Sequence, residues 1–434
     1  MKPNQSKKIR FKLVNNLIVV PLELNGVKLS FVLDTGVSKP ILFNIVNTDS
    51  LKIKQVETIF LQGLGSEGSI EALRSKRNLL RFGPAINVNQ DVFVVFDNTI
   101  NFTPRLGVPV HGIIGYDIFK DFVVEVNYGG RYIRLYKSEK FKSKNADRWR
   151  TLPINLYKRK PYLNAEVKID STYKSVKLLI DSGGSDALWL FKNEASGLTY
   201  RDDMFFEDYL GKGLSGPVYG QRSRLNEFKL ADYQIKNVNV AFPDSSSLNV
   251  ARMYRERSGS IAGNLLKRFN FIFDYRNKTI QFKKNKNFKA PFYYNNAGVV
   301  LEQHGTRLVK QQIASKVIDS YGNERESGNN AIELSTRYSF VLKPSFEIVD
   351  LRDNSNAKRA GLMLGDVITE INNNKTHRMT LQQVNSYFYD RLGKSISIRV
   401  ERDGQSKLFR FKLDDVFKKK SPQIEGSSDS ISKM

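Results

Sequence analysis

Apolar and polar residues alternate along most of the first 285 residues of the chain. Valine, isoleucine, threonine, tyrosine and phenylalanine recur at every second position, and amphipathic windows of helical length are few. A period of two is typical of β-strands that bury one face. The pattern therefore predicts a mostly β architecture for residues 10–285.

This β region contains the same pattern twice. Leu33-Asp34-Thr35-Gly36 returns as Ile180-Asp181-Ser182-Gly183, and Gly112-Ile113-Ile114-Gly115 returns as Ser260-Ile261-Ala262-Gly263. The two aspartates lie 147 positions apart, and the final glycines of the later segments lie 148 apart. A duplicated lobe is the simplest explanation of so long a period.

The rest of the chain follows a different pattern. Residues 283–335 are rich in lysine and asparagine, whereas residues 346–412 predict strands, two short helices and a closing hairpin. We therefore expect five parts: a first lobe over 1–145, a second lobe over 146–290, a connector packed on the second lobe over 291–338, a C-terminal α+β domain over 339–414, and a disordered tail over 415–434.

Composition narrows the chemistry. The 434 residues include no cysteine and only three histidines, His111, His304 and His377. The missing thiols exclude disulfides, zinc ribbons and thiol nucleophiles, and the few histidines argue against a Ser–His triad or a histidine metal site. We expect neither a metal nor another cofactor.

The charge is strongly basic, with 69 lysines and arginines against 44 acidic residues and a net charge of +25. Such a field attracts nucleic acid or anionic membranes, but no compact basic run is interleaved with stacking aromatics. We interpret it as a solvated basic surface without a nucleic-acid partner. No stretch reaches the length of a membrane span, and no apolar segment follows the basic start. We expect a cytoplasmic protein as written, or a periplasmic or secreted one if a leader is missing.

The repeated triplets carry the candidate chemistry. Each aspartate ends an apolar strand and is followed by a hydroxyl residue and a glycine, namely Thr35-Gly36 and Ser182-Gly183. The glycine lets the chain turn and brings backbone N–H groups to the carboxylate, while the hydroxyls can bond across a two-fold interface. Two lobes joined in this way would bring Asp34 and Asp181 together around one water molecule.

Two adjacent carboxylates suit hydrolysis. Because like charges about 3 Å apart do not both ionise, the pair shares one proton. One carboxylate then acts as the base on the water, and the other donates its proton to a substrate carbonyl oxygen, which gives a tetrahedral diol. The apparent pKa values belong to the pair and not to either residue.

With these motifs the chain resembles the bacterial retropepsin-like aspartyl peptidases that carry a C-terminal PDZ domain, over about residues 10–415. The resemblance implies a two-lobed β-barrel peptidase fold, a monomer, and extended peptides or proteins as substrates. It makes Asp34 and Asp181 the catalytic dyad and Thr35 and Ser182 the interlocking hydroxyls. The segments that end in Gly115 and Gly263 would pack beneath the dyad loops, which Gly36 and Gly183 turn.

One position departs from the pepsin-like enzymes. The third residue after each aspartate is Val37 or Gly184, where pepsins have a hydroxyl that bonds the carboxylate. With fewer donors to the ionised form, we expect a less acidic dyad and an optimum at weakly acidic or neutral pH. His111, before Gly112, is interpreted as a packing or surface residue and not as a catalytic one.

Two glycine loops recur at the same offset. Gly63-Leu64-Gly65-Ser66-Glu67-Gly68 fits the dinucleotide pattern, but its echo Gly211-Lys212-Gly213-Leu214-Ser215-Gly216 runs into Pro217 and strand-like sequence. An ordinary hairpin remains an alternative. Both loops lie where an aspartic peptidase places a flap, so we expect substrate contacts from Gly63, Leu64, Gly65, Gly211, Gly213 and Leu214.

The segment from Ala360 to Asn372 (AGLMLGDVITEIN) resembles the A-G-L-x-x-G-D-x-I-x-x-I-N run of bacterial PDZ domains. Such domains bind a C-terminal or internal peptide by adding a strand to a sheet edge. We expect the groove between the strand over 346–350 and the second helix, lined by Phe346, Ile348, Val384 and Tyr387. The preceding loop, 342–345, lacks the glycine that a carboxylate-binding loop would need. A spacer role for this domain remains an alternative.

The leading prediction is an aspartic endopeptidase, a hydrolase whose PDZ domain recruits or presents protein substrates. Two alternatives stay open. A catalytically degenerate peptide-binding adaptor on the same fold would keep peptide affinity without cleavage at any pH. A binder of nucleic acid or of an envelope surface would show strongly salt-dependent affinity.

Overall fold

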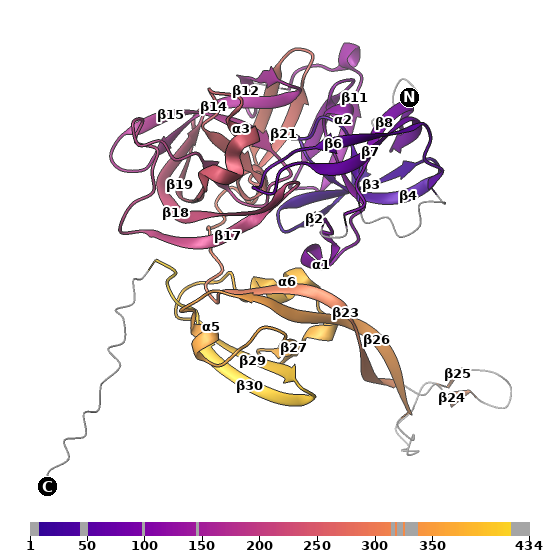
Figure 1. Cartoon of the computed structure of the whole chain (residues 1–434), viewed down its shortest axis with the longest axis vertical. Coiled ribbons are helices and arrows are strands. Elements are labelled where there is room, and N and C mark those ends of the chain that lie inside the picture. Colours follow the sequence, from indigo (N-terminus) through magenta and orange to yellow (C-terminus); the bar gives the residue numbers. More distant parts are fainter. Residues whose placement is uncertain are drawn as a thin grey trace, which may run out of the picture.

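The computed structural model describes residues 8–43, 51–97, 100–144, 147–313, 317–318, 324–325 and 337–417, and of 312–337 only the backbone. It consists mostly of β-strands, which confirms the predicted fold class. Two lobes lie side by side, with the N-terminal one in indigo and the second in magenta, and a C-terminal domain lies beneath them (Figure 1).

Each lobe is built on an eight-stranded sheet, and the two sheets have the same strand order. The first lobe has, across its sheet, β2 (Lys12–Val14), β3 (Leu17–Leu24), β4 (Val27–Leu33), β9 (Gly112–Ile114), β5 (Ile41–Leu42), β8 (Ala85–Val94), β7 (Ile70–Phe82) and β6 (Val56–Leu61). The second has β13 (Asn155–Tyr157), β14 (Lys160–Lys168), β15 (Tyr173–Asp181), β20 (Gly259–Ala262), β16 (Leu188–Leu190), β19 (Tyr233–Pro243), β18 (Gly216–Leu230) and β17 (Phe205–Gly213). The shared order is the structural form of the sequence repeat.

A six-stranded sheet joins the lobes. Its order is β1 (Ile9–Arg10), β11 (Tyr132–Tyr136), β10 (Val123–Asn127), β21 (Phe269–Asp274), β22 (Thr279–Lys284) and β12 (Arg150–Pro153). Strands β10 and β21 pair antiparallel at its centre, with Val126 opposite Phe271. The strand–turn–strand units that close the two repeats therefore meet here, and their buried side chains merge both lobes into one core.

Alternation explains why these segments fold as strands. In β3, Ile18, Val20, Leu22 and Leu24 are buried, while the intervening Pro21 is exposed. The buried set packs into the common core. Short helices interrupt the strands at α1 (Thr103–Leu106), α2 (Tyr116–Phe119), α3 (Asn249–Arg252) and α4 (Gly263–Leu266), and single 3₁₀ turns at η2 (Ser138–Lys140) and η3 (Ser245–Leu248).

The C-terminal domain has its own sheet and core. The strand order is β23 (Val299–Ile313), β26 (Arg337–Leu351), β27 (Val367–Ile371), β29 (Ser395–Arg402) and β30 (Gln405–Lys412), with β28 (Asn374–Lys375) beside β27. The helices are α5 (Asn356–Arg359), η4 (Thr376–Arg378) and α6 (Leu381–Ser386), and a small ribbon of β24 (Val317–Ile318) and β25 (Glu324–Arg325) follows β23. A capping box between Thr380 and Gln383 begins α6.

The structure corrects the expected connector over 291–338 from Ala297 onward, whereas Tyr294 before it does bond the second lobe. Strand β23 lies within it and pairs along β26, with Leu301 opposite Ile348. Ala297, Val299 and Leu301 are buried in the core of the C-terminal domain and not against the second lobe. The domain therefore begins before 339, because its sheet needs this strand to cover one side of β26.

The expected PDZ groove is wrong for the same reason. Phe346 and Ile348 are buried in the domain core, and their strand β26 has neighbours on both sides, β23 and β27. Val384 is also a core residue, and Tyr387 packs against the core from α6. The edge strand beside α6 is β23, and the loop before it contains a glycine, Gly298, with φ of +73°.

The predicted tail over 415–434 is ordered at its start. The Phe417 ring contacts the rings of Phe206 and Tyr294 at centroid distances of 5.7 Å. Residues 418–434 lie outside the described part of the chain. Phe417 therefore lies against the second lobe.

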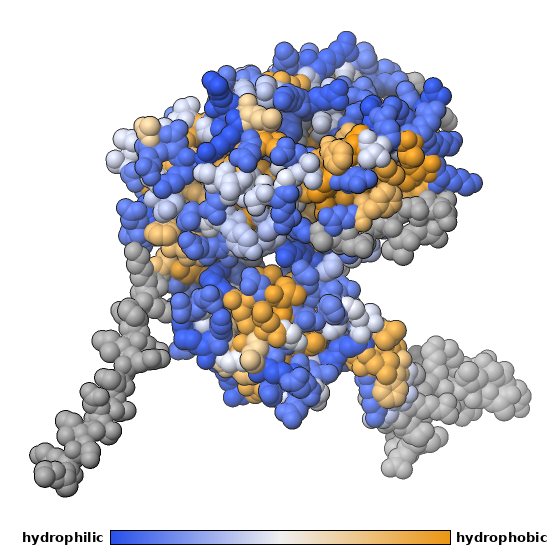
Figure 2. Space-filling model, viewed as in Figure 1, coloured by the Kyte–Doolittle hydropathy of each residue, from blue (hydrophilic) through white to orange (hydrophobic). Residues whose placement is uncertain are grey.

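The face of the molecule seen in Figure 2 is largely hydrophilic. One apolar patch lies on the outer part of the β23–β26 ribbon, where Leu308, Phe340 and Leu342 are exposed. Among the described residues, no helix has the length and apolar character needed to cross a membrane.

The position of β23 predicts a contrast between two leucines on that strand. Leu301→Ala removes a side chain that is only 3% exposed and should lower the free energy of unfolding of the C-terminal domain by about 2–4 kcal/mol. Leu308→Ala removes one that is 61% exposed and should change it by less than about 0.5 kcal/mol. Urea denaturation of the two variants checks this; equal losses would contradict the assignment of β23 to this core.

Candidate active site

Asp34 directly follows β4, and the parallel neighbour β9 holds it in place. Leu33 lies opposite Ile114, and the Asp34 N–H donates to the Ile114 carbonyl oxygen at 2.8 Å. The residue after Ile114 must be glycine, because a Cβ at Gly115 would lie 1.9 Å from the Asp34 carbonyl oxygen. The segment Ile113–Gly115 therefore packs against the loop that carries Asp34.

The second lobe repeats this arrangement. Asp181 ends β15 opposite Ala262 of the parallel strand β20. The Gly263 N–H donates to the Gly184 carbonyl oxygen at 2.8 Å. A Cβ at Gly263 would lie 2.5 Å from the Asn16 carbonyl oxygen of the first lobe. Gly263 therefore supports its dyad loop and also lets the two lobes approach closely.

The two hydroxyl residues interlock the loops. The Thr35 N–H donates to Ser182 Oγ at 3.0 Å, and the Ser182 N–H donates to Thr35 Oγ1 at 3.1 Å. Each hydroxyl then donates to the opposite strand, Thr35 to the Ile180 carbonyl oxygen and Ser182 to the Leu33 carbonyl oxygen. Both residues are buried, so this four-bond arrangement fixes one loop against the other.

The interlocked loops bring the two carboxyl groups together. A Cβ at Gly36 would lie 3.0 Å from Asp34 Oδ1 and 3.7 Å from Asp181 Oδ1, so these oxygens are separated by at most the sum of the two distances. A Cβ at Gly183 would lie 2.4 Å from Asp34 Oδ2. Gly183 thus leaves room for the carboxyl group of Asp34, which a larger residue would push away, and Gly36 lies beside one oxygen of each carboxyl group.

Backbone donors hold both carboxylates. The Gly36 N–H donates to Asp34 Oδ1 at 2.7 Å, and the Gly183 N–H donates to Asp181 Oδ1 at 3.0 Å. Burial, together with repulsion from Asp181, nevertheless raises the pKa of Asp34 to about 7, against the opposing hydrogen bond from Gly36. Burial also raises the pKa of Asp181, opposed by the charge of Arg257 and the Gly183 hydrogen bond. The pair therefore retains a proton at weakly acidic pH.

Two cations near the dyad were missed from the sequence. The charges of Lys160 and Arg257 both oppose the rise in pKa of the aspartates, and burial lowers the pKa of each cation. Tyr275 also lies near, and its hydroxyl is buried without a hydrogen-bond partner among the described residues. All three lie far in sequence from either Asp-Thr/Ser-Gly motif, so no local pattern marks them.

His111 has a backbone partner. The imidazole Nδ1 of His111 accepts a hydrogen bond from the Ser30 backbone N–H at 3.1 Å. The backbone N–H of His111 donates to the Ser30 carbonyl oxygen at 2.8 Å. Burial lowers the pKa of its imidazole. These bonds tie the segment before β9 to β4.

The glycine loops are the tips of two hairpins. The first hairpin is β6–β7 with its tip over 62–69, and the second is β17–β18 with Leu214 and Ser215 at the tip. Because a strand and not a helix follows the first loop, the dinucleotide alternative loses the helix N-terminus that it requires. Gly211 lies at an irregularity in β17, with no atom within 4 Å of a Cβ placed there.

The two tips are bonded to each other. The Gly63 N–H donates to Ser215 Oγ at 3.0 Å, and the Ser215 N–H donates to the Leu64 carbonyl oxygen at 2.9 Å. A Cβ at Gly65 would lie 2.0 Å from the Ser215 carbonyl oxygen, and one at Gly213 would lie 2.1 Å from the Leu64 carbonyl oxygen. The glycines are therefore required by the close approach of the tips.

Each tip also places a leucine on the opposite lobe. Leu64 of the first hairpin packs against second-lobe clusters that contain Leu248 and Val218. Leu214 of the second hairpin packs against a first-lobe cluster that contains Val32. This reciprocal exchange keeps the two hairpins together across the lobes.

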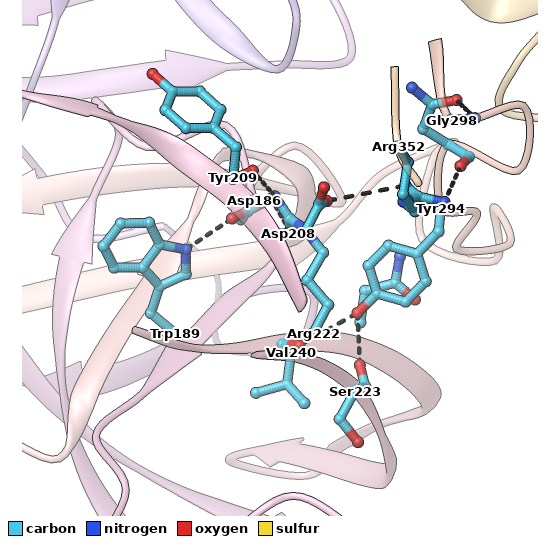
Figure 3. Close-up of polar contacts among 12 residues, drawn as sticks. Asp186, Trp189, Asp208, Tyr209, Arg222, Ser223, Val240, Tyr294, Gly298 and Arg352 are labelled. Atoms are coloured by element: carbon cyan, nitrogen blue, oxygen red, sulfur yellow. Dashed lines mark hydrogen bonds and ion pairs between the residues drawn. The ribbon is translucent and has the colours of Figure 1, made fainter. Parts of the chain in front are cut away.

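A polar network surrounds Asp186, a few residues after Asp181 in the chain (Figure 3). Arg222 bonds Asp186 at 2.8 Å and Asp208 at 2.6 Å, and the Trp189 indole N–H donates to Asp186 at 2.7 Å. Burial lowers the pKa of Arg222, but the two carboxylates more than reverse this, so it stays charged. Arg352 of the C-terminal domain lies 4.0 Å from Asp208. The network thus links that domain to the chain segment after Asp181.

Comparison with known families supports both parts of the resemblance. Residues 20–118 match the family described as aspartyl protease, and residues 347–402 match the family described as PDZ domain. No curated protein matches the chain. The chain therefore contains an aspartyl protease domain and a C-terminal PDZ domain, which supports a protease-type function with peptide binding.

Removal of one hydroxyl tests the interlock. Thr35→Ala leaves the buried Ser182 N–H and Ile180 carbonyl oxygen without their partner and should lower the free energy of unfolding by about 2–4 kcal/mol. Thr35→Ser keeps the hydroxyl and should cost less than about 1.5 kcal/mol. Urea denaturation compares the two; equal losses would show that the hydroxyl contributes no stability.

The raised pKa of Asp34 predicts a pH-dependent stability. Because the folded chain holds this proton more tightly than the unfolded chain, the stability contributed by the group falls as pH rises from about 4 through about 7. Asp34→Asn should therefore raise the free energy of unfolding at pH 8 by about 1–3 kcal/mol and change it little at pH 4. Urea denaturation at both pH values measures this, with the exposed Asp121→Asn as the control. A gain that is independent of pH would contradict it.

Proposed function

We propose that this protein is an aspartic endopeptidase in which Asp34 and Asp181, one from each lobe, activate a single water molecule. The observation that carries the proposal is the position of Gly36 between the two carboxyl groups. A Cβ placed at Gly36 would lie 3.0 Å from Asp34 Oδ1 and 3.7 Å from Asp181 Oδ1. A water molecule in contact with both carboxylates would be positioned for attack on a peptide carbonyl.

A single proton shared by Asp34 and Asp181 is what this chemistry requires. With one proton on the pair, the ionised carboxylate takes a proton from the water while the protonated one donates to the carbonyl oxygen of the substrate. The tetrahedral diol then collapses as a proton passes to the leaving amine nitrogen. The interlock of Thr35 with Ser182 holds both carboxyl groups in place throughout, so little reorganisation accompanies the step.

The two hairpins would serve as flaps over an extended substrate. Their tips are joined in this structure, so they have to separate or shift before a peptide enters. Backbone groups of Gly63, Gly65, Gly211 and Gly213 can then hydrogen-bond the peptide main chain, while Leu64 and Leu214 contact its side chains. The PDZ domain would bind a peptide segment of the substrate or of a partner.

Exchange of either aspartate tests the proposal. Asp34→Asn and Asp181→Asn should each lower the rate of peptide hydrolysis at least about a thousandfold, because the pair then lacks either its base or its acid. Mass spectrometry of a random peptide mixture after incubation measures the cleavage, with Asp121→Asn as a surface control. Retained cleavage in either dyad variant would refute the assignment.

The same assay separates the peptidase from a catalytically silent adaptor on this fold. An adaptor would retain peptides from the mixture but leave all of them intact over the whole pH range. Hydrolysis by the unaltered chain at any pH, lost in both dyad variants, would exclude the adaptor.

The pH dependence follows from the shared proton. Activity needs one proton on the pair, and burial raises the pKa of Asp34 to about 7, so the rate should be highest between about pH 4 and 7. The rate should fall at higher pH as the second carboxylate ionises. A rate profile across pH 2–9 measures this; a maximum below about pH 3 would contradict the raised pKa.

A further inference from the structure

The PDZ domain offers one sheet edge to a peptide beside its helix. Strand β26 is paired on both sides, so a peptide that adds a strand next to α6 must use the outer edge of β23. Helix α6 packs beside β23, and the loop with Gly298 precedes the strand. We call the surface between β23 over 299–303 and α6 over 381–386 the β23–α6 strip.

A turn of the first lobe lies on this strip. Helix α1 and its left-handed cap Gly107 form a compact turn, which we call the α1 turn (103–107). A Cβ at Gly107 would lie 2.8 Å from Leu381 Cβ of α6 and 3.6 Å from Gln303 Oε1 of β23. One residue of the lobe therefore contacts both walls of the strip.

Polar bonds hold the turn on both walls. Gln382 of α6 donates its amide N–H to the Leu106 carbonyl oxygen at 2.5 Å. Arg105 pairs through Nε with Glu302 Oε1 of β23 at 2.7 Å. The α1 label lies directly above α6 and β23, at the junction of the first lobe and the PDZ domain (Figure 1). The contact therefore combines close packing, a hydrogen bond and an ion pair.

We propose that the α1 turn occupies the peptide-binding strip of the PDZ domain in cis, so that an extended peptide binds there only after the turn has left. A peptide strand would lie about 4.8 Å from β23, in the space between this strand and α6. Gly107 already lies in that space, between Gln303 and Leu381. Peptide binding and docking of the PDZ domain on the lobe then exclude each other.

The same turn reaches the second flap hairpin. Arg105 donates through Nη1 to the Tyr209 hydroxyl at 2.5 Å, and its guanidinium lies 4.7 Å from the centre of the Tyr209 ring. Tyr209 belongs to β17, a strand of the β17–β18 hairpin. Arg105 therefore bridges the PDZ strand β23 and the flap strand β17.

A second PDZ contact on β17 supports this link. The Arg352 guanidinium lies 4.7 Å from the centre of the Phe206 ring and 4.0 Å from Asp208. Displacement of the α1 turn by a peptide would loosen both contacts with β17. In the proposed peptidase, a PDZ ligand would thus favour flap opening, and by linkage an open flap would favour the ligand. This consequence rests on the proposed function, whereas the occupation of the strip does not.

A reversible lock tests the occupation of the strip. Because the chain has no cysteine, Gly107→Cys with Leu381→Cys introduces one thiol pair, whose Cβ atoms lie within disulfide reach after a small shift. The pair is placed in an Asp34→Asn chain so that peptides are not cleaved. The probe is a mixture of random decapeptides with free carboxyl termini, and hydrogen exchange over residues 299–303 locates the binding.

We expect the oxidised and the reduced forms of this variant to differ in peptide binding. The oxidised form should show no peptide-dependent protection of residues 299–303, and reduction should raise peptide retention at least about fivefold with protection of these residues. The parent Asp34→Asn chain should not respond to the reductant. Failure of the pair to oxidise in the folded chain, or equal protection in both forms, would overturn the proposal.

A wedge variant provides a second test. Gly107→Val inserts atoms against Leu381 and should open the strip, which gives peptide retention at least about fivefold above the parent chain. Gly26→Val is the matched control, because Gly26 has a similar positive φ of +89° but no atom within 4 Å of a Cβ. Equal retention by both variants would overturn the proposal. All of these binding assays use the Asp34→Asn chain. Their results therefore remain interpretable even if the proposed peptidase function is wrong.

Discussion

Reciprocal hydrogen bonds between Thr35 and Ser182 join the two loops that carry Asp34 and Asp181. Each hydroxyl accepts from the backbone of the other lobe and donates to the strand that leads into the other aspartate. These hydrogen bonds oppose the electrostatic repulsion between the two carboxyl groups, which would otherwise drive the two loops apart. The central sheet brings the lobes together, and the interlock fixes the loops of Asp34 and Asp181 against each other.

The duplicated lobes are equal in topology but not in surroundings. Both hairpins exchange a tip leucine with the opposite lobe, and β17 of the second hairpin also contacts Arg352 of the PDZ domain through Phe206 and Asp208. The first lobe instead contributes the α1 turn to the PDZ strip. A single chain can therefore attach its third domain to one flap, an asymmetry that a dimer of identical subunits would not provide.

The sequence predicted those features that arise from local pattern. Alternation identified the strands, and the repeat located both aspartates, their hydroxyl partners and the supporting glycines Gly115 and Gly263. It could not place β23, because the 23 residues between Ile313 and Arg337 separate the strand from its partner β26. The local pattern therefore predicts Phe346 and Ile348 as groove residues, although pairing on both sides of β26 buries them. Lys160, Arg257 and Tyr275 were missed because only folding brings them near the dyad.

The pair of aspartates and the two-fold plan could be predicted from local pattern, since a carboxylate, a hydroxyl and a glycine after a strand recur at a fixed offset. Tertiary structure alone decided how the parts are joined. Contacts such as Gly63 with Ser215 and Gly107 with Leu381 connect residues more than a hundred positions apart, and no periodicity records them. The physical reason is that strand periodicity reports which face is buried, whereas the neighbour that buries it depends on the whole fold.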